Sequence, residues 1–236
     1  MIYAALRDAI IAERPVALVT GTTGGKLLVY ADGTTLGALP GVDADTVIAA
    51  ALALLARGEN TLRDVAGTQI FIETYPAPPT LLIVGAVHIA IPLVSFAKIL
   101  GYRTIVIDAR GVFATPERFA HADELIVDWP DDVLPGRITA NSAVVLLTHD
   151  PKLDDPALKV ALASEARYVG ALGSPKTHAQ RVARLRAEGV PDAQLARLHA
   201  PIGLKIGGAT PEAIALSIIA EIVAVRNGRL AAGERV

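Results

Sequence analysis

The second half of the chain alternates short apolar runs with longer stretches of helical periodicity. The apolar runs lie at residues 80–86, 103–109, 124–129, 142–149 and 166–173. The helical stretches lie at residues 88–100, 155–165, 175–188 and 211–226. Continuous apolar strands that alternate with helices indicate a parallel sheet buried on both faces. We therefore expect a Rossmann-like, doubly wound α/β domain over residues 80–230.

The first 75 residues have a different pattern. Strands are predicted at residues 16–20, 26–30, 34–39 and 68–75, and helices at 1–14 and 42–59. Asp43 or Asp45 would cap the second helix and Gly58 would end it. We expect a smaller α+β domain over residues 1–75. The sequence PAPP at 76–79 predicts a linker, because proline interrupts both helices and sheet pairing.

Composition narrows the classes of function. Hydrophobic residues make up 52% of the 236 residues, and the formal net charge of −2 gives no electrostatic argument for nucleic acid or an anionic membrane. There is no Cys, which excludes disulfides, thiolate metal sites and a cysteine nucleophile. Residues 75–97 carry no Lys, Arg, Asp or Glu, but the strand–turn–helix pattern argues against a membrane span. With no signal-peptide cleavage region recognised, we expect a cytoplasmic protein.

The stretch VGAVHIA (84–90) lies where the first apolar run passes into a helix. In dinucleotide-binding domains the first glycine of this turn makes the bend and the second lets pyrophosphate approach the backbone. An acidic residue about 20 positions later binds a ribose hydroxyl. Gly85 and Asp108 fit the first and last roles, but Val87 replaces the second glycine. The turn is therefore a modified ligand site or a turn without a ligand, and we expect His88 beside it to be partly buried.

The segment LLTHDPKLDD (146–155) follows the fourth strand of the second domain. Ligands in open α/β sheets collect at the carboxyl ends of the strands, so His149 and Asp150 are candidates for ligand contact. We expect Asp154, or its neighbour Asp155, to cap a helix that begins at Pro156. The spacing of these groups does not indicate a metal site.

The segment GALGSPKTHAQRVARLR (170–186) contains a further helix start. Gly173 ends a strand, Ser174 is a suitable N-cap, and Pro175 suits the first helical position. Lys176 then lies near a helix N-terminus, which disfavours a cation unless an anion is bound there. We expect the three following arginines to form a solvated helix face: Arg181, Arg184 and Arg186.

Together these segments resemble the xanthine dehydrogenase accessory factor family, of the XdhC/CoxI type. The resemblance covers most of the chain and is strongest after residue 70. It is carried, in the family's order and spacing, by FIETYPAPPTLLIVGAVHIA, VLLTHD, YVGALGSPKTHAQR and PIGLKIGGATPEAIALSIIAEIVAVRNG. The chain departs from the family at Val87, where the GAG turn has Gly, and at TLGALPGVDAD (35–45), where the family carries a Cys.

The resemblance implies an accessory factor for a molybdenum hydroxylase of the xanthine dehydrogenase or CO dehydrogenase type. Such a protein binds molybdenum cofactor (molybdopterin) and assists its sulfuration or its insertion into the apo-enzyme, more as a chaperone than as a turnover enzyme. Its partners would be the apo molybdenum hydroxylase, a sulfur donor such as a cysteine desulfurase, and a second copy in a homodimer. The resemblance implies cofactor contacts at Gly85, His88, Asp108, His149, Gly173, Ser174, Lys176, Gly203 and Gly207. Val87 and Asp150 join this set by their positions.

Two other interpretations stay open. An NAD(P)-dependent oxidoreductase is supported by Asp108 and opposed by Val87 and by the lack of a convincing set of hydride-transfer residues. A ligand-free scaffold could also retain this fold. No residue is assigned a catalytic or metal-ligating role. A chain without Cys cannot hold a persulfide, so a partner would have to bring the sulfur.

Overall fold

The computed structural model describes residues 1–230. The chain folds into two compact units, Met1–Pro78 and Pro79–Val236. The boundary falls inside the proline-rich stretch at 76–79. Each unit has its own sheet and its own buried apolar core.

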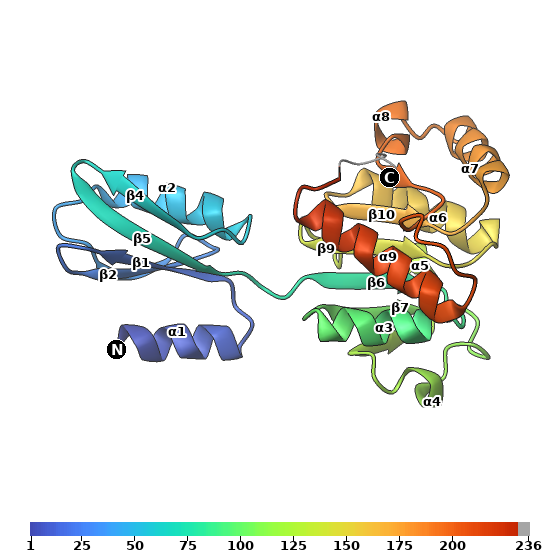
Figure 1. Ribbon diagram of the computed structural model, residues 1–236, viewed down its shortest axis with the longest axis horizontal. Helices are drawn as coiled ribbons and strands as arrows, with labels where there is room; N and C mark the ends of the chain where they lie inside the picture. Colours follow the sequence, from blue (N-terminus) through green and yellow to red (C-terminus); the bar gives the residue numbers. More distant parts are fainter. Residues whose placement is uncertain (231–236) are drawn as a thin grey trace. The chain divides into compact units, whose positions relative to one another are not determined.

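The first unit is built on an antiparallel sheet in the order β3-β2-β1-β5-β4. Its elements are α1 (Ile2–Ile11), β1 (Val16–Gly21), β2 (Lys26–Tyr30), β3 (Thr35–Ala38), α2 (Ala44–Leu55), β4 (Thr61–Val65) and β5 (Thr68–Tyr75). Side chains alternate between the two faces of a strand. Helices α2 and α1 lie on opposite faces of this sheet (Figure 1). On β1, Ala17 and Val19 pack in the core on the α2 side, whereas Val16 and Leu18 pack in the core on the α1 side. Both faces of this sheet are therefore covered, which explains why β1 is apolar from Val16 to Val19.

Strand β4 is an addition to the prediction. Its residues TLRDV are mostly exposed, and it pairs only with β5 at the edge of the sheet. A strand in that position needs no apolar run, so the hydrophobic pattern gave no signal. Of the two caps considered for α2, Asp43 is correct, because its carboxylate accepts a hydrogen bond from the Thr46 N–H at 3.0 Å.

The second unit contains a parallel sheet in the order β11-β10-β9-β6-β7-β8. The strands are β6 (Thr80–Val84), β7 (Arg103–Ile107), β8 (Glu124–Ile126), β9 (Ser142–Leu146), β10 (Tyr168–Ala171) and β11 (Leu198–His199). Numbered within the unit, this is the order 3-2-1-4-5-6 of dinucleotide-binding domains. The order reverses between β6 and β9, and ligands bind at this switch point in such folds.

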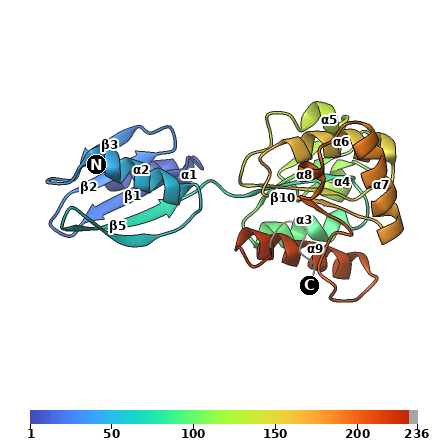
Figure 2. The same cartoon turned by 90° about the horizontal axis from the view of Figure 1, so that it is seen from above.

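Helices cover both faces of the parallel sheet (Figure 2). They are α3 (Ala90–Ile99), α4 (Pro116–Phe119), α5 (Pro130–Val133), α6 (Pro151–Ala163), α7 (Pro175–Ala187), α8 (Asp192–Leu195) and α9 (Pro211–Arg226). On β6, Leu81 and Ile83 face the core shared with α3 and α9, and Leu82 and Val84 face the core shared with α6, α7 and α8. The predicted fold class, a doubly wound α/β domain with a smaller α+β domain, is confirmed.

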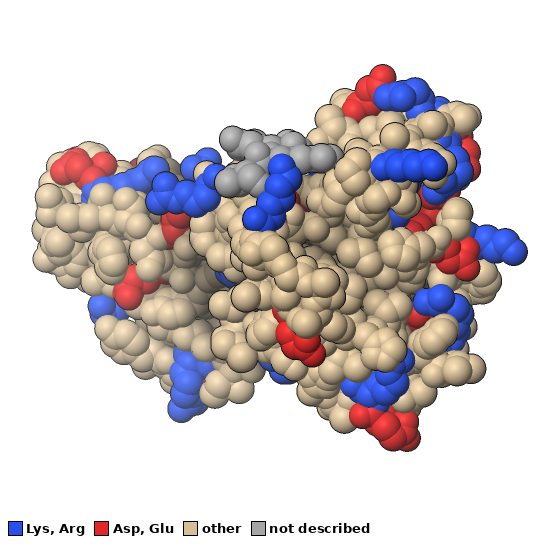
Figure 3. Space-filling view, turned by 45° about the vertical axis from the view of Figure 1, so that its right-hand side comes forward, with Lys and Arg blue, Asp and Glu red and all other residues tan. Residues whose placement is uncertain are grey.

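The short elements α4, α5, α8 and β11 were not predicted, because segments of two to four residues are too short to show a period. Throughout residues 1–230, helices fall short of the length and apolar character that a membrane crossing requires. On the face drawn in Figure 3, acidic and basic side chains are interspersed among uncharged ones. That face therefore offers no extended patch of one sign, in keeping with the net charge of −2.

Candidate functional site

An open cleft of about 500 Å³ lies at the carboxyl ends of β6 and β9, where the strand order reverses. It is lined by Val87, Arg110, Leu147, Thr148, His149, Asp150 and Pro151. Three of these were candidates from the sequence: Val87, His149 and Asp150. Arg110, which follows β7 by three positions, was not among the residues predicted from the sequence.

Gly85 makes the turn after β6. Its φ is +109°, and a Cβ added there would lie 2.6 Å from the Thr148 Cγ2. The Gly85 N–H donates to the carbonyl oxygen of Ile107 at 2.8 Å, which ties the turn to β7. Only glycine meets both demands, the left-handed backbone and the close contact between the two loops that form the cleft.

Asp108 is fully buried at the end of β7, and its carboxylate is saturated with hydrogen bonds. One oxygen accepts from the Arg110 N–H at 3.0 Å and from Arg110 Nε at 2.9 Å. The other accepts from the Ala86 N–H and from Arg110 Nη2, both at 2.8 Å. Burial raises the pKa of Asp108, but the bonds from Arg110 and Ala86 outweigh it and lower the pKa overall. As arranged, Asp108 has no acceptor position free for a ribose hydroxyl.

Arg110 is held by this carboxylate at the wall of the cleft. Its guanidinium carbon lies 4.7 Å from the centre of the Phe113 ring, so the ring supports one face. Hydrogen bonds to Asp108 raise the pKa of Arg110. Its Nη1 takes part in none of the hydrogen bonds found among residues 1–230. A permanently charged donor edge is therefore presented to the cleft.

The helix that follows Gly85 begins two residues later than the predicted residue 88. Helix α3 begins at Ala90, after a turn in which the Ala90 N–H donates to the Val87 carbonyl oxygen at 3.0 Å. His88 is exposed, so the expectation of a partly buried histidine is wrong. Among the described residues, no hydrogen bond uses the N–H groups of Val87 or His88, so both can donate to a ligand.

The loop after β9 places His149 and Asp150 in the cleft wall, with His149 exposed. Asp150, and not Asp154 or Asp155, is the N-cap of α6, because its carboxylate accepts from the Lys152 N–H at 3.0 Å. The helix starts at Pro151, and Pro156 lies inside it. The earlier proline is the first-turn proline, a role that the sequence analysis assigned to the later one.

Asp154 belongs instead to a buried ion pair. It accepts hydrogen bonds from the Thr148 hydroxyl and from Arg181 Nη2, the latter at 3.2 Å. Burial raises the pKa of Asp154 against the lowering effect of these partners. Arg181 is only 1% exposed, so its predicted place on a solvated face is wrong. Arg184 is partly exposed, but its Nε pairs with the Asp155 carboxylate at 2.6 Å.

The start of α7 follows the prediction. Ser174 caps the helix by accepting from the Thr177 N–H at 3.1 Å, and Pro175 is at the first helical position. Lys176 is exposed, forms no ion pair among residues 1–230, and does not line the cleft. Strand β10 ends at Ala171, between Gly170 and Gly173, and Gly173 has a φ of +149°. The structure thus explains the cap locally and leaves a ligand role for Lys176 as a prediction.

The loop that contains Gly203 and Gly207 rests on a buried polar cluster that the sequence did not reveal. Glu221 accepts from the Tyr168 hydroxyl and, at 2.8 Å, from the Gly203 N–H. His199 Nδ1 lies 3.4 Å from the same carboxylate, and the His199 ring stacks on Tyr168 with centroids 4.5 Å apart. Burial raises the pKa of Glu221, but its bonds to His199 and Tyr168 lower it overall. Gly207 is exposed and has no part in the cluster.

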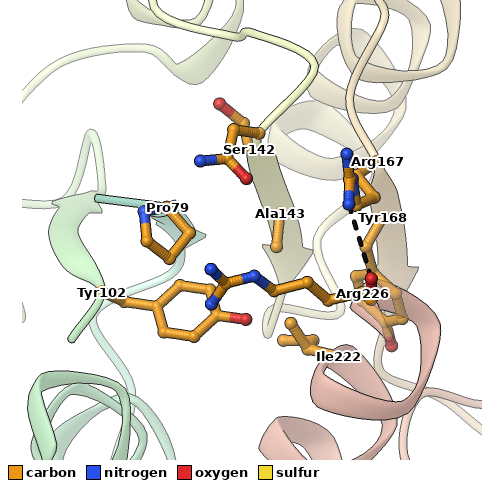
Figure 4. A pocket seen from close by; sticks show the side chains of 9 residues that line it. Pro79, Tyr102, Ser142, Ala143, Arg167, Tyr168, Ile222 and Arg226 are labelled. Atoms are coloured by element: carbon orange, nitrogen blue, oxygen red, sulfur yellow. Dashed lines mark hydrogen bonds between the residues drawn. The ribbon is translucent and has the colours of Figure 1, made fainter. Parts of the chain in front are cut away.

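A second, much smaller cavity lies at the amino ends of β6, β9 and β10 (Figure 4). Its lining includes Tyr102, Tyr168, Arg167 and Arg226, and Arg167 Nη1 donates to the Arg226 carbonyl oxygen at 3.4 Å. Its volume of about 10 Å³ is room for about one water molecule. The large cleft at the opposite edge is therefore the candidate ligand site.

A parallel sheet of this strand order with a cleft at its switch point defines a Rossmann-type ligand-binding domain. The family model described as the XdhC Rossmann domain matches residues 81–222. The chain belongs to this family, which confirms the resemblance drawn from the sequence for XdhC. The CoxI type stays a prediction.

Individual relatives extend this result. The chain is 33% identical over 161 residues to a protein of Bacillus subtilis named as a probable xanthine dehydrogenase subunit, covering 68% of this chain and 47% of that protein. It is 34% identical over 90 residues to the molybdenum cofactor insertion chaperone PaoD of Escherichia coli, covering 38% and 28%. A crystal structure described as a xanthine dehydrogenase from Bacillus halodurans matches with a TM-score of 0.72 and 28% identity, covering 95% of this chain and 66% of that one. The chain matches less than half of the length of these two curated relatives.

Proposed function

We propose that this chain is an accessory factor that binds molybdenum cofactor in the cleft at the switch point and delivers it to an apo molybdenum hydroxylase. Family membership and the likeness to a protein named as a molybdenum cofactor insertion chaperone support the role. The single observation that carries the site is the cleft, with Arg110 and Asp150 both in its wall.

The chemistry of these residues fits the cofactor. Molybdopterin has an anionic phosphate at one end and a pterin with ring N–H and amino donors at the other. Arg110 offers a charged donor edge, which suits phosphate. Asp150 uses one carboxylate oxygen for the α6 cap, so its other oxygen can accept from pterin donors. The exposed His149 in the same lining can donate or accept.

Sulfuration, where it occurs, depends on a partner. The chain has no Cys to hold a persulfide, so a donor such as a cysteine desulfurase would supply sulfur directly to the bound cofactor. We further propose that the protein works as a homodimer in the cytoplasm. Size-exclusion chromatography with light scattering tests the dimer, and a reconstitution with and without desulfurase tests the sulfur source.

The proposed binding is tested with the purified chain and anaerobically released molybdenum cofactor. We expect saturable binding at micromolar cofactor, and activation of apo-hydroxylase that rises with the amount of loaded chain. Asp150→Asn should weaken binding, because asparagine keeps the helix cap but removes the charge. Arg226→Gln, at the opposite edge of the sheet, is the matched control and should bind normally. Absence of saturable binding by the unaltered chain would sink the proposal.

A second candidate function is an NAD(P)-dependent oxidoreductase, because the strand order is that of dinucleotide-binding domains. Two observations oppose it: Asp108 has no free acceptor, and Val87 lines the cleft where a dinucleotide would need bare backbone. Titration with NADH tests it by fluorescence. Val87→Gly tests whether the chain is a ligand-free scaffold. If this variant gains affinity for a nucleotide, the Val87 side chain is what closes the site in the unaltered chain.

A further inference from the structure

Arg110 has features of a prepared anion contact. Its Nε and Nη2 are both bonded to Asp108, and its guanidinium lies against the Phe113 ring. The side chain is still 36% exposed and lines the cleft, with Nη1 unused among residues 1–230. A guanidinium fixed in this way loses little rotamer freedom when a ligand binds, because its geometry is already set.

The saturated Asp108 decides what this end of the cleft can recognise. A free carboxylate at this position would accept the two hydroxyls of a ribose. Here the carboxylate accepts four N–H bonds from Ala86 and Arg110, so Asp108 offers no acceptor and this pair presents only the free donors of Arg110 to a ligand. The end of the cleft at β7 is therefore built for an acceptor-rich anion and not for a sugar diol.

Val87 and Asp150 restrict the position of that anion. The branched side chain of Val87 occupies the cleft wall where a pyrophosphate would lie along the turn. Asp150, at the end of the loop that follows β9, places negative charge in the same cleft. An anion is thus favoured next to Arg110 and disfavoured next to Asp150, whose charge also raises the pKa of Arg110.

We infer that Arg110 binds a terminal phosphate monoester of the ligand that occupies the cleft, and that Asp108 is a positioning residue that holds Arg110 for this contact. This inference rests on the proposed function for its ligand, since molybdopterin ends in a phosphate monoester. The same group occurs as the 2′-phosphate of NADPH. The chemistry recognised is shared, and binding experiments distinguish the two sources.

The test compares Asp108→Asn with the double variant Asp108→Asn/Arg110→Gln in the full chain. Removing Arg110 alone would leave the buried Asp108 charge without its partner and could unfold the domain. Arg103→Gln is the matched control, because Arg103 also pairs with a carboxylate but lies at the other end of β7. Circular dichroism and thermal unfolding check that each variant is folded. The probes are anaerobic molybdenum cofactor, NADPH, NADH and inorganic phosphate.

We expect the double variant to bind molybdenum cofactor about tenfold or more weakly than Arg103→Gln, which is the effect of one lost charge-assisted contact. Asp108→Asn should bind with an affinity between these two, because it keeps the Arg110 guanidinium but loosens its support. Inorganic phosphate should displace the cofactor from Arg103→Gln and much less from the double variant. If the chain binds NADPH in preference to NADH and does not bind molybdenum cofactor, an Arg110-dependent preference upholds the phosphate contact while the proposed function fails. A double variant that binds the cofactor as tightly as Arg103→Gln overturns the inference and leaves the proposed function standing. Binding of none of the probes overturns both.

Discussion

Replacing Arg181 with methionine should destabilise the second unit strongly. Arg181 is 1% exposed, and its Nη2 bonds to Asp154 at 3.2 Å and to the Leu172 carbonyl oxygen at 3.0 Å. Methionine has a similar length but no donor, so Asp154, itself 1% exposed, would keep a buried charge without its cation. Breaking a buried ion pair on one side costs about 3–5 kcal/mol. For a unit of this size, that loss lowers the melting temperature by roughly 10 °C.

The effect should depend on pH in a defined direction. Burial already raises the folded-state pKa of Asp154, and loss of Arg181 would raise it further. An acid with a raised folded pKa destabilises the fold in full above that pKa, and the destabilisation disappears only below the unfolded value of 3.8. The difference in stability between Arg181→Met and the unaltered chain should therefore be largest above the folded pKa of Asp154 and shrink as the pH falls through that pKa toward 3.8.

Urea and thermal unfolding monitored by circular dichroism between pH 5 and 8 measure this effect. Arg186→Met is the matched control: Arg186 lies on the same helix, but its pair with Asp192 is exposed on both sides. Its effect should stay within about 0.5 kcal/mol. The double variant Asp154→Asn/Arg181→Met should recover part of the loss, because no buried charge remains. An Arg181→Met variant as stable as Arg186→Met at pH 7 would refute the reasoning.

Three further predictions concern stability. Gly85→Ala should lower the free energy of unfolding by about 2 kcal/mol or more, because the new Cβ would lie 2.6 Å from Thr148 at a φ of +109°. Gly101→Ala is the control: its new Cβ would have no atom within 4 Å, so only the backbone strain of about 1 kcal/mol is expected, and equal losses for the two variants would contradict this. Ser174→Ala should lower stability by about 1 kcal/mol through loss of the α7 cap, and Ser174→Asp should restore it in urea titrations. Glu221 has a lowered pKa, so its contribution is present above the unfolded value near 4.5 and is lost as the pH falls through the folded value. Glu221→Gln should therefore flatten the acid side of the stability profile; an unchanged slope would count against it.

The sequence determined those features that depend on neighbouring residues. The apolar runs predicted the five longer strands of the second unit, because a strand buried on both faces must be apolar along its length. The cap at Ser174 and Pro175 was also visible, since capping involves only the first turn of the helix. Gly85 could be assigned to its turn on the same ground. Such signals survive in a linear sequence because their partners lie within a few positions.

The tertiary structure alone decided the contacts between distant segments. From the sequence, Arg181 was predicted to lie on the surface. In the structure α7 packs beside α6 and brings Arg181 to Asp154, 27 positions earlier. Asp108 was a candidate to accept a ribose hydroxyl. In the structure Arg110 and Ala86 donate hydrogen bonds to both of its carboxylate oxygens. Arg110 gains its place in the cleft only when the turn after β6 meets the loop after β9. The sequence does not show whether a charged side chain is solvated or buried in an ion pair. Folding decides this, because only folding brings the side chain to a distant partner.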